Sequence, residues 1–158
     1  MAASALVGAG FLVALLSRRD ANHRWAAVQA PRLPPPWMTC EAVLSQAAHL
    51  LGARGTKSLA SLLRRGALVC SYRFADDAEA VLKLLEKYAD MPISFADAYL
   101  VRMTETLNDP VLLTTNADFR IYRRHGRQII PCMLLRLAPR IDNALRLPRP
   151  CAWRCRSW

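Results

Sequence analysis

Short apolar runs alternate with stretches of helical apolar spacing along most of this chain. Residues 4–7 form an apolar run that predicts a buried strand, and Gly8 and Gly10 predict a tight turn before a helix over 11–17. The later elements expected from the same pattern are a helix over 20–30, a proline-rich loop over 31–36, a brief strand over 37–39, helices over 40–51 and 56–65, a strand over 67–74, helices over 76–88 and 94–107, and strands over 111–113 and 128–130. This alternation predicts an α/β fold, with a mostly parallel sheet covered by helices on both faces.

Helix boundaries are marked by local chemistry in the second half of the chain. Acidic residues stand in the first turn of the expected helix over 76–88, and Ser94 can cap the next helix. Asn108, Asp109 and Pro110 then form a strong stop before an all-apolar strand. Two helices followed by a buried strand are therefore expected between residues 76 and 113.

The pattern ends near Leu137, beyond which prolines interrupt an arginine-rich segment without periodic apolar spacing. One domain is expected over residues 1–137, followed by a basic, disordered tail over 138–158. Residues 136–158 carry 6 basic and 1 acidic residues, so this end of the chain supplies +5 of the net charge of +10. A basic RNA-binding arm is the alternative interpretation of this tail.

Composition limits the class of protein. The chain has 158 residues and is 53% hydrophobic, which is typical of a globular domain and not of a disordered one. The five cysteines are odd in number and form no zinc-ligand pattern, so reduced thiols in a cytoplasmic protein are expected. The positive charge is compatible with a polyanionic partner but does not choose among RNA, DNA, lipid and acidic protein.

An apolar stretch opens the chain, and it raises the question of a signal peptide or membrane anchor. It lacks positive charge before the apolar run, it is shorter than the about 20 residues that a membrane helix needs, and glycines break it. We therefore expect a buried strand that turns into a helix, and no membrane association.

A few acidic residues occupy positions at strand ends or helix starts in apolar surroundings. Glu41, Asp97 and Asp118 are the members of this set, with Asn116 beside the last. Each has an ordinary structural explanation as a helix-dipole partner, a capping-box residue or part of an Asx turn. Together they are expected to meet at the carboxyl ends of parallel strands, where ligand sites lie in open sheets. Clustered carboxylates bind magnesium or manganese, which can activate water for phosphodiester hydrolysis.

Several motifs resemble those of one known family. The runs ADMPISFADAYLVRMTE (89–105) and LLTTNADFRIYRRHGRQIIP (112–131) are similar to the C-terminal half of VapC-like PIN domains. The runs GFLVALLSRRDANHRWA (10–26) and TCEAVLSQAAHLL (39–51) are similar to the N-terminal half. The motifs stand in the order of the family and cover about residues 5–135.

The resemblance implies a three-layer α/β/α sandwich and a magnesium-dependent (or manganese-dependent) ribonuclease, the toxin of a toxin-antitoxin pair. It further implies a cognate antitoxin as partner, an RNA substrate, a homodimer and a cytoplasmic location. The second family acid is matched to Glu41, the third to Asp97, and the closing motif to Thr114, Asn116, Asp118 and Phe119. Catalysis is thereby expected from Glu41, Asp97 and Asp118, with Asn116 as a further metal ligand.

One position departs from the family pattern. The first acid of the family ends the first strand, and Gly8 stands in its place here. Losing a charged ligand weakens magnesium binding, so weak or absent nuclease activity is expected. The alternative is a catalytically inactive binding protein that sequesters antitoxin or RNA.

Substrate binding is assigned to Thr114 and to the basic segment that contains Arg123, Arg124 and Arg127. These arginines could hold RNA phosphates near the site, or they could form an ordinary solvated loop.

Overall fold

A five-stranded parallel sheet forms the centre of the molecule. The computed structural model describes residues 4–135, so the expected tail over 138–158 lies outside the described residues. The strand order is β3-β2-β1-β4-β7, and every neighbouring pair is parallel. The strands are β1 (Ser4–Val7), β2 (Trp37–Cys40), β3 (Leu68–Tyr72), β4 (Pro110–Thr114) and β7 (Cys132–Leu134). The mostly parallel α/β sheet predicted from the sequence is confirmed.

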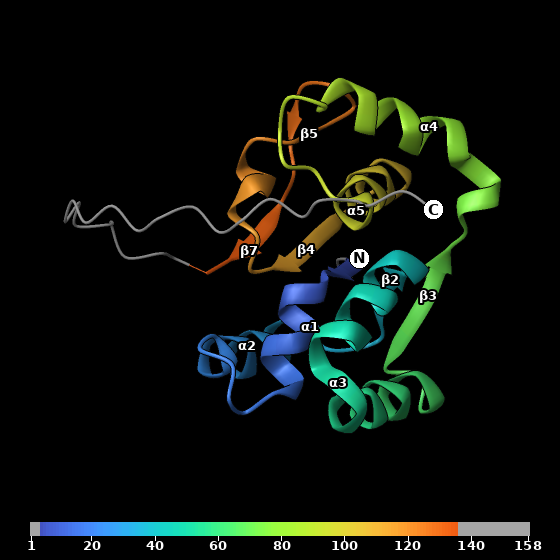
Figure 1. The fold of residues 1–158 in the computed structure, drawn as a ribbon. Helices are drawn as coiled ribbons and strands as arrows, with labels where there is room; N and C mark the ends of the chain where they lie inside the picture. Colours follow the sequence, from blue (N-terminus) through green and yellow to red (C-terminus); the bar gives the residue numbers. More distant parts are fainter. Residues whose placement is uncertain (1–3, 136–158) are drawn as a thin grey trace, which may run out of the picture.

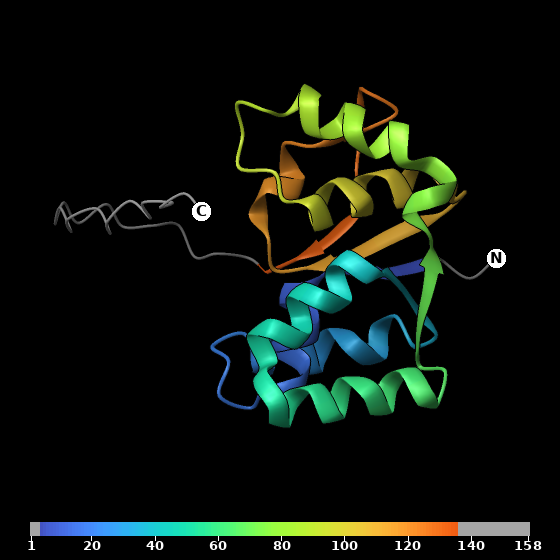
Figure 2. The same cartoon turned by 45° about the vertical axis from the view of Figure 1, so that its right-hand side comes forward.

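Helices cover both faces of this sheet. One layer holds α1 (Ala9–Leu16), α2 (His23–Gln29) and α3 (Glu41–Arg64), and the other holds α4 (Phe74–Lys87) and α5 (Phe95–Thr106). Figures 1 and 2 show the two layers on opposite sides of the strands. Short 3-10 turns η1 (Ala30–Arg32) and η2 (Ala117–Arg120) follow α2 and β4.

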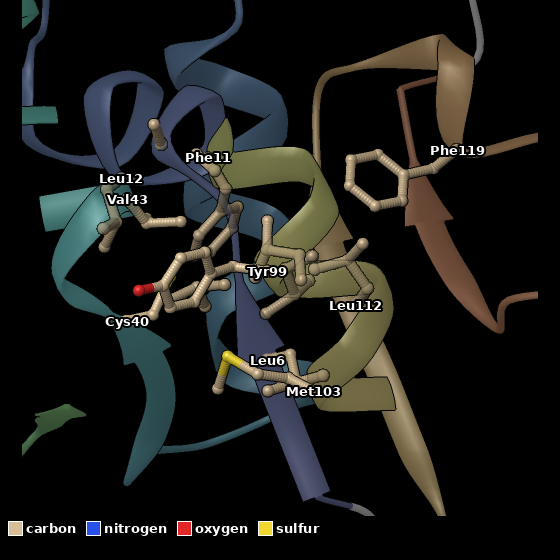
Figure 3. Close-up of a cluster of buried hydrophobic side chains, with 14 of the residues drawn as sticks. Leu6, Phe11, Leu12, Cys40, Val43, Tyr99, Met103, Leu112 and Phe119 are labelled. Atoms are coloured by element: carbon tan, nitrogen blue, oxygen red, sulfur yellow. The ribbon is translucent and has the colours of Figure 1, made fainter. Parts of the chain in front are cut away.

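The core lies on both faces of β1 and β4, the two central strands. Leu6, Val7, Leu112 and Leu113 are fully buried, as expected for strands covered on both sides. Figure 3 shows Leu6 and Leu112 among side chains from the surrounding helices, with Met103 and Tyr99 contributed by α5. This packing fixes the carboxyl ends of β1 and β4, which support the candidate site.

The two helices expected over 40–51 and 56–65 are both present, as the two halves of α3 on either side of a kink. Gly52 has a positive φ of 64° and marks a kink inside α3. The Thr56 hydroxyl donates to the carbonyl oxygen of Gly52 at 2.8 Å, which helps to hold the chain together across the kink. Gly52 therefore bends the helix where the sequence pattern predicted an end.

The end of the described chain also differs from expectation. Residues 128–130 were expected to form the last strand of the sheet, but β6 (Gln128–Ile129) pairs with β5 (Arg123–Arg124) in a separate antiparallel hairpin. His125 and Gly126 both have positive φ in the three-residue connection 125–127, where the Arg127 N–H donates to the carbonyl oxygen of Arg124 at 3.3 Å and closes the turn. The fifth strand of the sheet is β7, which pairs with β4 from Leu112 to Thr114.

No helix among residues 4–135 is long and apolar enough to cross a membrane.

Candidate functional site

A pocket of about 270 Å³, lined by polar and apolar side chains, lies at the carboxyl ends of β1 and β4. Gly8 follows β1, and Thr114, Thr115 and Asn116 lie at the end of β4 and directly after it. The other polar side chains of the lining are Ser94 and Asp97 at the start of α5 and Gln46 on α3. This position agrees with the expected location of a ligand site in an open parallel sheet. We call it the Asp97 pocket.

Asp97 is held by the start of its own helix. Its backbone N–H donates to the Ser94 hydroxyl at 3.0 Å, and its Oδ2 accepts from the Ser94 N–H at 3.1 Å. This reciprocal pair is a capping box, and it holds the carboxylate at the N-terminus of α5. The second oxygen, Oδ1, accepts from the Asn116 amide at 3.4 Å. Asp97 therefore forms the capping box suggested by the sequence, and it also lies at the carboxyl ends of the strands, as expected.

Asn116 forms hydrogen bonds with Thr114 at the end of β4 and with Asp118 in η2. Its side-chain oxygen accepts from the Asp118 N–H at 3.0 Å, and its own N–H donates to the Thr114 hydroxyl at 3.1 Å. Burial raises the pKa of Tyr122 to about 12, and the charges of Asp97 and Asp118 add to that shift. Both carboxylates thus lie within electrostatic range of one buried hydroxyl. Asp97, Asn116, Asp118 and Thr114 form one connected neighbourhood.

Neither Glu41 nor Asp118 lines the Asp97 pocket, so the expected role of both carboxylates as metal ligands stays a prediction. Burial, together with the charge of Glu41, raises the pKa of the Cys70 thiol on β3 to about 11, and the pKa of Tyr99 on α5 is also raised, by burial and in part by the charge of Glu41. Within residues 4–135 no group of three or more His, Cys, Asp or Glu side chains could hold a metal ion. Glu41, Asp97 and Asp118 therefore do not form a metal site by themselves among the described residues, and their binding of one ion stays a prediction.

Gln46 is the polar side chain of α3 that lines the pocket, beside the apolar Leu50, and it was not among the site residues expected from the sequence. It stands five residues after Glu41, which corresponds to about 140° around a helix. The two side chains consequently point in different directions, and of the two only Gln46 lines the Asp97 pocket. The register of apolar positions could have revealed this, because Val43 and Ala47 are the buried residues that mark the inner face of this part of α3.

Two glycines let α1 approach the pocket closely. A Cβ at Gly10 would stand only 2.0 Å from the Thr115 hydroxyl, so no other residue fits there without movement. A Cβ at Gly8 would meet the Thr114 hydroxyl at 3.3 Å and Leu100 at 3.4 Å, which is tight but tolerable after a small shift. Gly8 also has an extended backbone, φ −91° and ψ 165°, which any residue can adopt. The structure thus requires glycine at Gly10 but not at Gly8.

The polar side chains of the pocket offer the oxygen ligands that a hard divalent cation prefers, but they carry little of the negative charge that such a cation needs. Oxygen atoms from Asp97, Asn116, Gln46 and Thr114 are of the type that magnesium prefers. Only Asp97 carries a charge, and both of its oxygens already accept hydrogen bonds. A cation bound here would be held by Asp97 and Asn116 and would need several waters.

The basic hairpin makes mostly internal contacts. The Arg123 guanidinium donates to the carbonyl oxygens of Arg120, Ile121 and Tyr122 at 2.6 to 2.9 Å. That of Arg124 donates to the carbonyl oxygen of Leu107 at 3.1 Å. Both side chains hold the hairpin against its neighbours, and Arg127 is exposed.

Comparison with known proteins gives a family and solved structures of similar fold. The model of the PIN domain matches residues 5–125. The crystal structure of Mycobacterium tuberculosis VapC20, a Sarcin-Ricin loop cleaving toxin, superposes with a TM-score of 0.66 and 24% sequence identity. The match covers 73% of this chain and 92% of that one, so the two share a fold. Among curated proteins, none matches the chain.

Proposed function

Because the chain belongs to the PIN domain family, we propose that it acts on RNA as a toxin-type, metal-dependent endoribonuclease with reduced activity. The observation that carries this proposal is the Asp97 pocket at the carboxyl ends of β1 and β4, lined by oxygen donors. The fold shared with VapC20, which is named as a toxin that cleaves the Sarcin-Ricin loop, supports RNA as the substrate class.

Metal binding is the step at which this chain should be weak. Magnesium or manganese, when bound, would activate a water for attack on the phosphodiester bond and offset charge on the leaving oxygen. Asp97 and Asn116 would hold the cation, and Asp118 would orient Asn116 through the hydrogen bond between them. Gly8 and Gln46 supply no negative charge, so affinity for the cation should be low.

Of the four residues expected to contact RNA, Thr114 and Arg127 are the two that are placed to do so. The Thr114 hydroxyl lies in the pocket lining, where it could meet the substrate. Arg127 is exposed at the tip of the hairpin and free to meet a phosphate. Arg123 and Arg124 would act mainly by holding that tip in place.

We further propose a cognate antitoxin, a homodimer and a cytoplasmic location, as the family resemblance implies. Exposed apolar side chains near the pocket, Leu50 and Phe95, are suited to a protein partner because they are 59% and 43% accessible.

The test of cleavage compares the unmodified chain with Gly8→Asp and Asp97→Asn on a mixed RNA pool and on a sarcin-ricin stem-loop. We expect slow cleavage that needs magnesium or manganese, no cleavage by Asp97→Asn, and an increase of about tenfold or more for Gly8→Asp. Equal cleavage by the unmodified chain and Asp97→Asn would contradict the assignment of the pocket.

A second candidate function is a catalytically inactive PIN-fold protein that sequesters antitoxin or RNA. The presence of two carboxamides, Gln46 and Asn116, beside a single carboxylate favours it. The melting temperature at millimolar magnesium or manganese distinguishes the two, because a ligand that binds only the native state raises it. A shift supports the nuclease, and RNA binding without any shift supports the inactive protein.

A further inference from the structure

A second pocket, of about 460 Å³, lies at the other end of α1, where this helix meets the second half of α3. Its polar lining consists of Arg18, Arg19, Arg54, Ser17 and Ser58. No acidic side chain within residues 4–135 lines it. We call it the arginine pocket.

The three guanidinium groups are available to a ligand. Arg18, Arg19 and Arg54 are exposed, and within the described part of the chain none forms an ion pair or a side-chain hydrogen bond. The nearby Asp20 uses its carboxylate to accept from the Asn22 N–H at 2.8 Å. Three like charges in one pocket repel each other, and an anion relieves that repulsion. The pocket is therefore suited to an anionic ligand.

The kink in α3 builds this arrangement. Gly52 turns the helix, and Figure 2 shows the second half of α3 running in a new direction beneath α1. Gly55 lies in the pocket wall at a point where a Cβ would come within 2.7 Å of the Leu51 side chain. The bend brings Arg54 and Ser58 to the end of α1. The pocket is thus formed by specific backbone features and is not a chance cluster of surface arginines.

The arginine pocket and the Asp97 pocket lie along the same pair of helices. Gly8 and Gly10 at the start of α1 line the Asp97 pocket, and Leu16 at its end lines the arginine pocket. On α3, Leu50 lines the Asp97 pocket, and the adjacent Leu51 lines the arginine pocket. The eight residues of α1 span about 12 Å, a distance that a strand of a few nucleotides covers.

We propose that the arginine pocket binds a backbone phosphate of the same RNA strand whose phosphodiester to be cleaved lies in the Asp97 pocket, a few nucleotides away. Guanidinium groups match the geometry of phosphate oxygens and pair with them through two hydrogen bonds, and serine hydroxyls can add further donors. The proximity of the two pockets favours RNA over an acidic peptide as the occupant. This subsite rests on the proposed action on RNA.

The experiment measures binding of a short fluorescent single-stranded RNA to the full chain by anisotropy in EDTA, so that no cleavage occurs. The test variant is Arg18→Gln/Arg54→Gln. Its matched control is Arg64→Gln/Arg65→Gln, which removes the same charge from exposed positions at the far end of α3. Circular dichroism melting verifies that both variants are folded.

We expect the test variant to bind RNA about tenfold more weakly than the control variant. Its plot of log affinity against log salt should also be shallower by about 0.7 for one lost phosphate contact. Inorganic phosphate at matched ionic strength should displace no more RNA than chloride does.

Four results would overturn the proposal. Equal binding by the two variants removes the subsite and leaves the proposed nuclease function standing. If the test variant loses binding to a polyglutamate peptide but binds RNA as well as the control variant does, the pocket is assigned to an acidic protein. Specific displacement of RNA by inorganic phosphate assigns it to the free ion. If the unmodified chain binds no RNA at all, the proposed function fails together with the subsite.

Discussion

The charge of a single side chain decides how strongly the Asp97 pocket can attract a cation. Asp97 is the one carboxylate in its lining, and the neighbouring oxygens of Gln46 and Asn116 are neutral. Each carboxamide has nearly the shape of a carboxylate, so converting it to the acid changes charge with little change in volume. The pocket therefore offers a direct way to separate charge from geometry.

We expect Gln46→Glu/Asn116→Asp to create a stronger magnesium site. The added carboxylates repel one another without metal, and a bound cation relieves that repulsion. The melting temperature should fall without metal and rise by on the order of 5 °C in millimolar magnesium, more than that of the unmodified chain. Differential scanning fluorimetry measures both. Glu41→Gln is the control, because Glu41 lies beside Cys70, and a loss of the metal shift in that variant would contradict the placement of Glu41.

At the scale of elements, the contact between α1 and the end of β4 holds the pocket together. Gly10 on α1 lies against Thr115, directly after the last residue of β4. The backbone of Gly8 is joined to the same strand, because its N–H donates to the carbonyl oxygen of Leu113 at 3.0 Å. The start of α1 is thus fixed to β4 by close packing as well as by a hydrogen bond.

Gly10→Ala should lower the free energy of unfolding by about 1–3 kcal/mol, because its Cβ would overlap the Thr115 hydroxyl. Urea denaturation measures the change. Gly10→Ala/Thr115→Ala should recover part of the loss, since the hydroxyl that causes the overlap is then absent. A Gly10→Ala protein as stable as the unmodified chain would show that α1 does not pack this closely on β4.

At the scale of the whole molecule, an ion-pair network ties α4 to α5. The Arg102 guanidinium on α5 donates to Asp77 on α4 and to Glu105 one turn further along its own helix. The Tyr72 hydroxyl at the end of β3 donates to the same Asp77 carboxylate at 3.0 Å. The Arg102 hydrogen bond holds the pKa of Asp77 below its ordinary value of 3.8. This network joins β3, α4 and α5, and α5 is the helix that carries Asp97.

The stabilisation from Asp77 should depend on pH. Since its pKa is lower in the folded chain than in the unfolded one, the stabilisation is fully present above the unfolded value of 3.8 and is lost as pH falls through the folded value. Asp77→Asn should therefore be less stable than the unmodified chain near neutral pH, and the difference should narrow in acid. Urea denaturation at several pH values measures it. Asp76→Asn is the control, because Asp76 forms no ion pair in the part of the chain that the structure describes; a matching loss in that variant would argue against the network.

The sequence alone determined the class of fold and part of the site. Alternating apolar runs and helical stripes are local features, so they predicted the parallel sheet, its two helix layers and the capping box of Asp97. The side chains at the ends of β1 and β4 followed from the same reasoning, because the carboxyl ends of parallel strands share one edge of the sheet.

Only the tertiary structure decided which face of α3 meets that edge. Glu41 and Gln46 both stand near the start of one helix, and the rotation of that helix against the sheet places Gln46 in the pocket and Glu41 beside Cys70. The pairing of β7 with β4 is likewise a contact between segments distant in the sequence. Local patterns fix what an element is, whereas the direction in which its side chains point depends on the surfaces against which it packs.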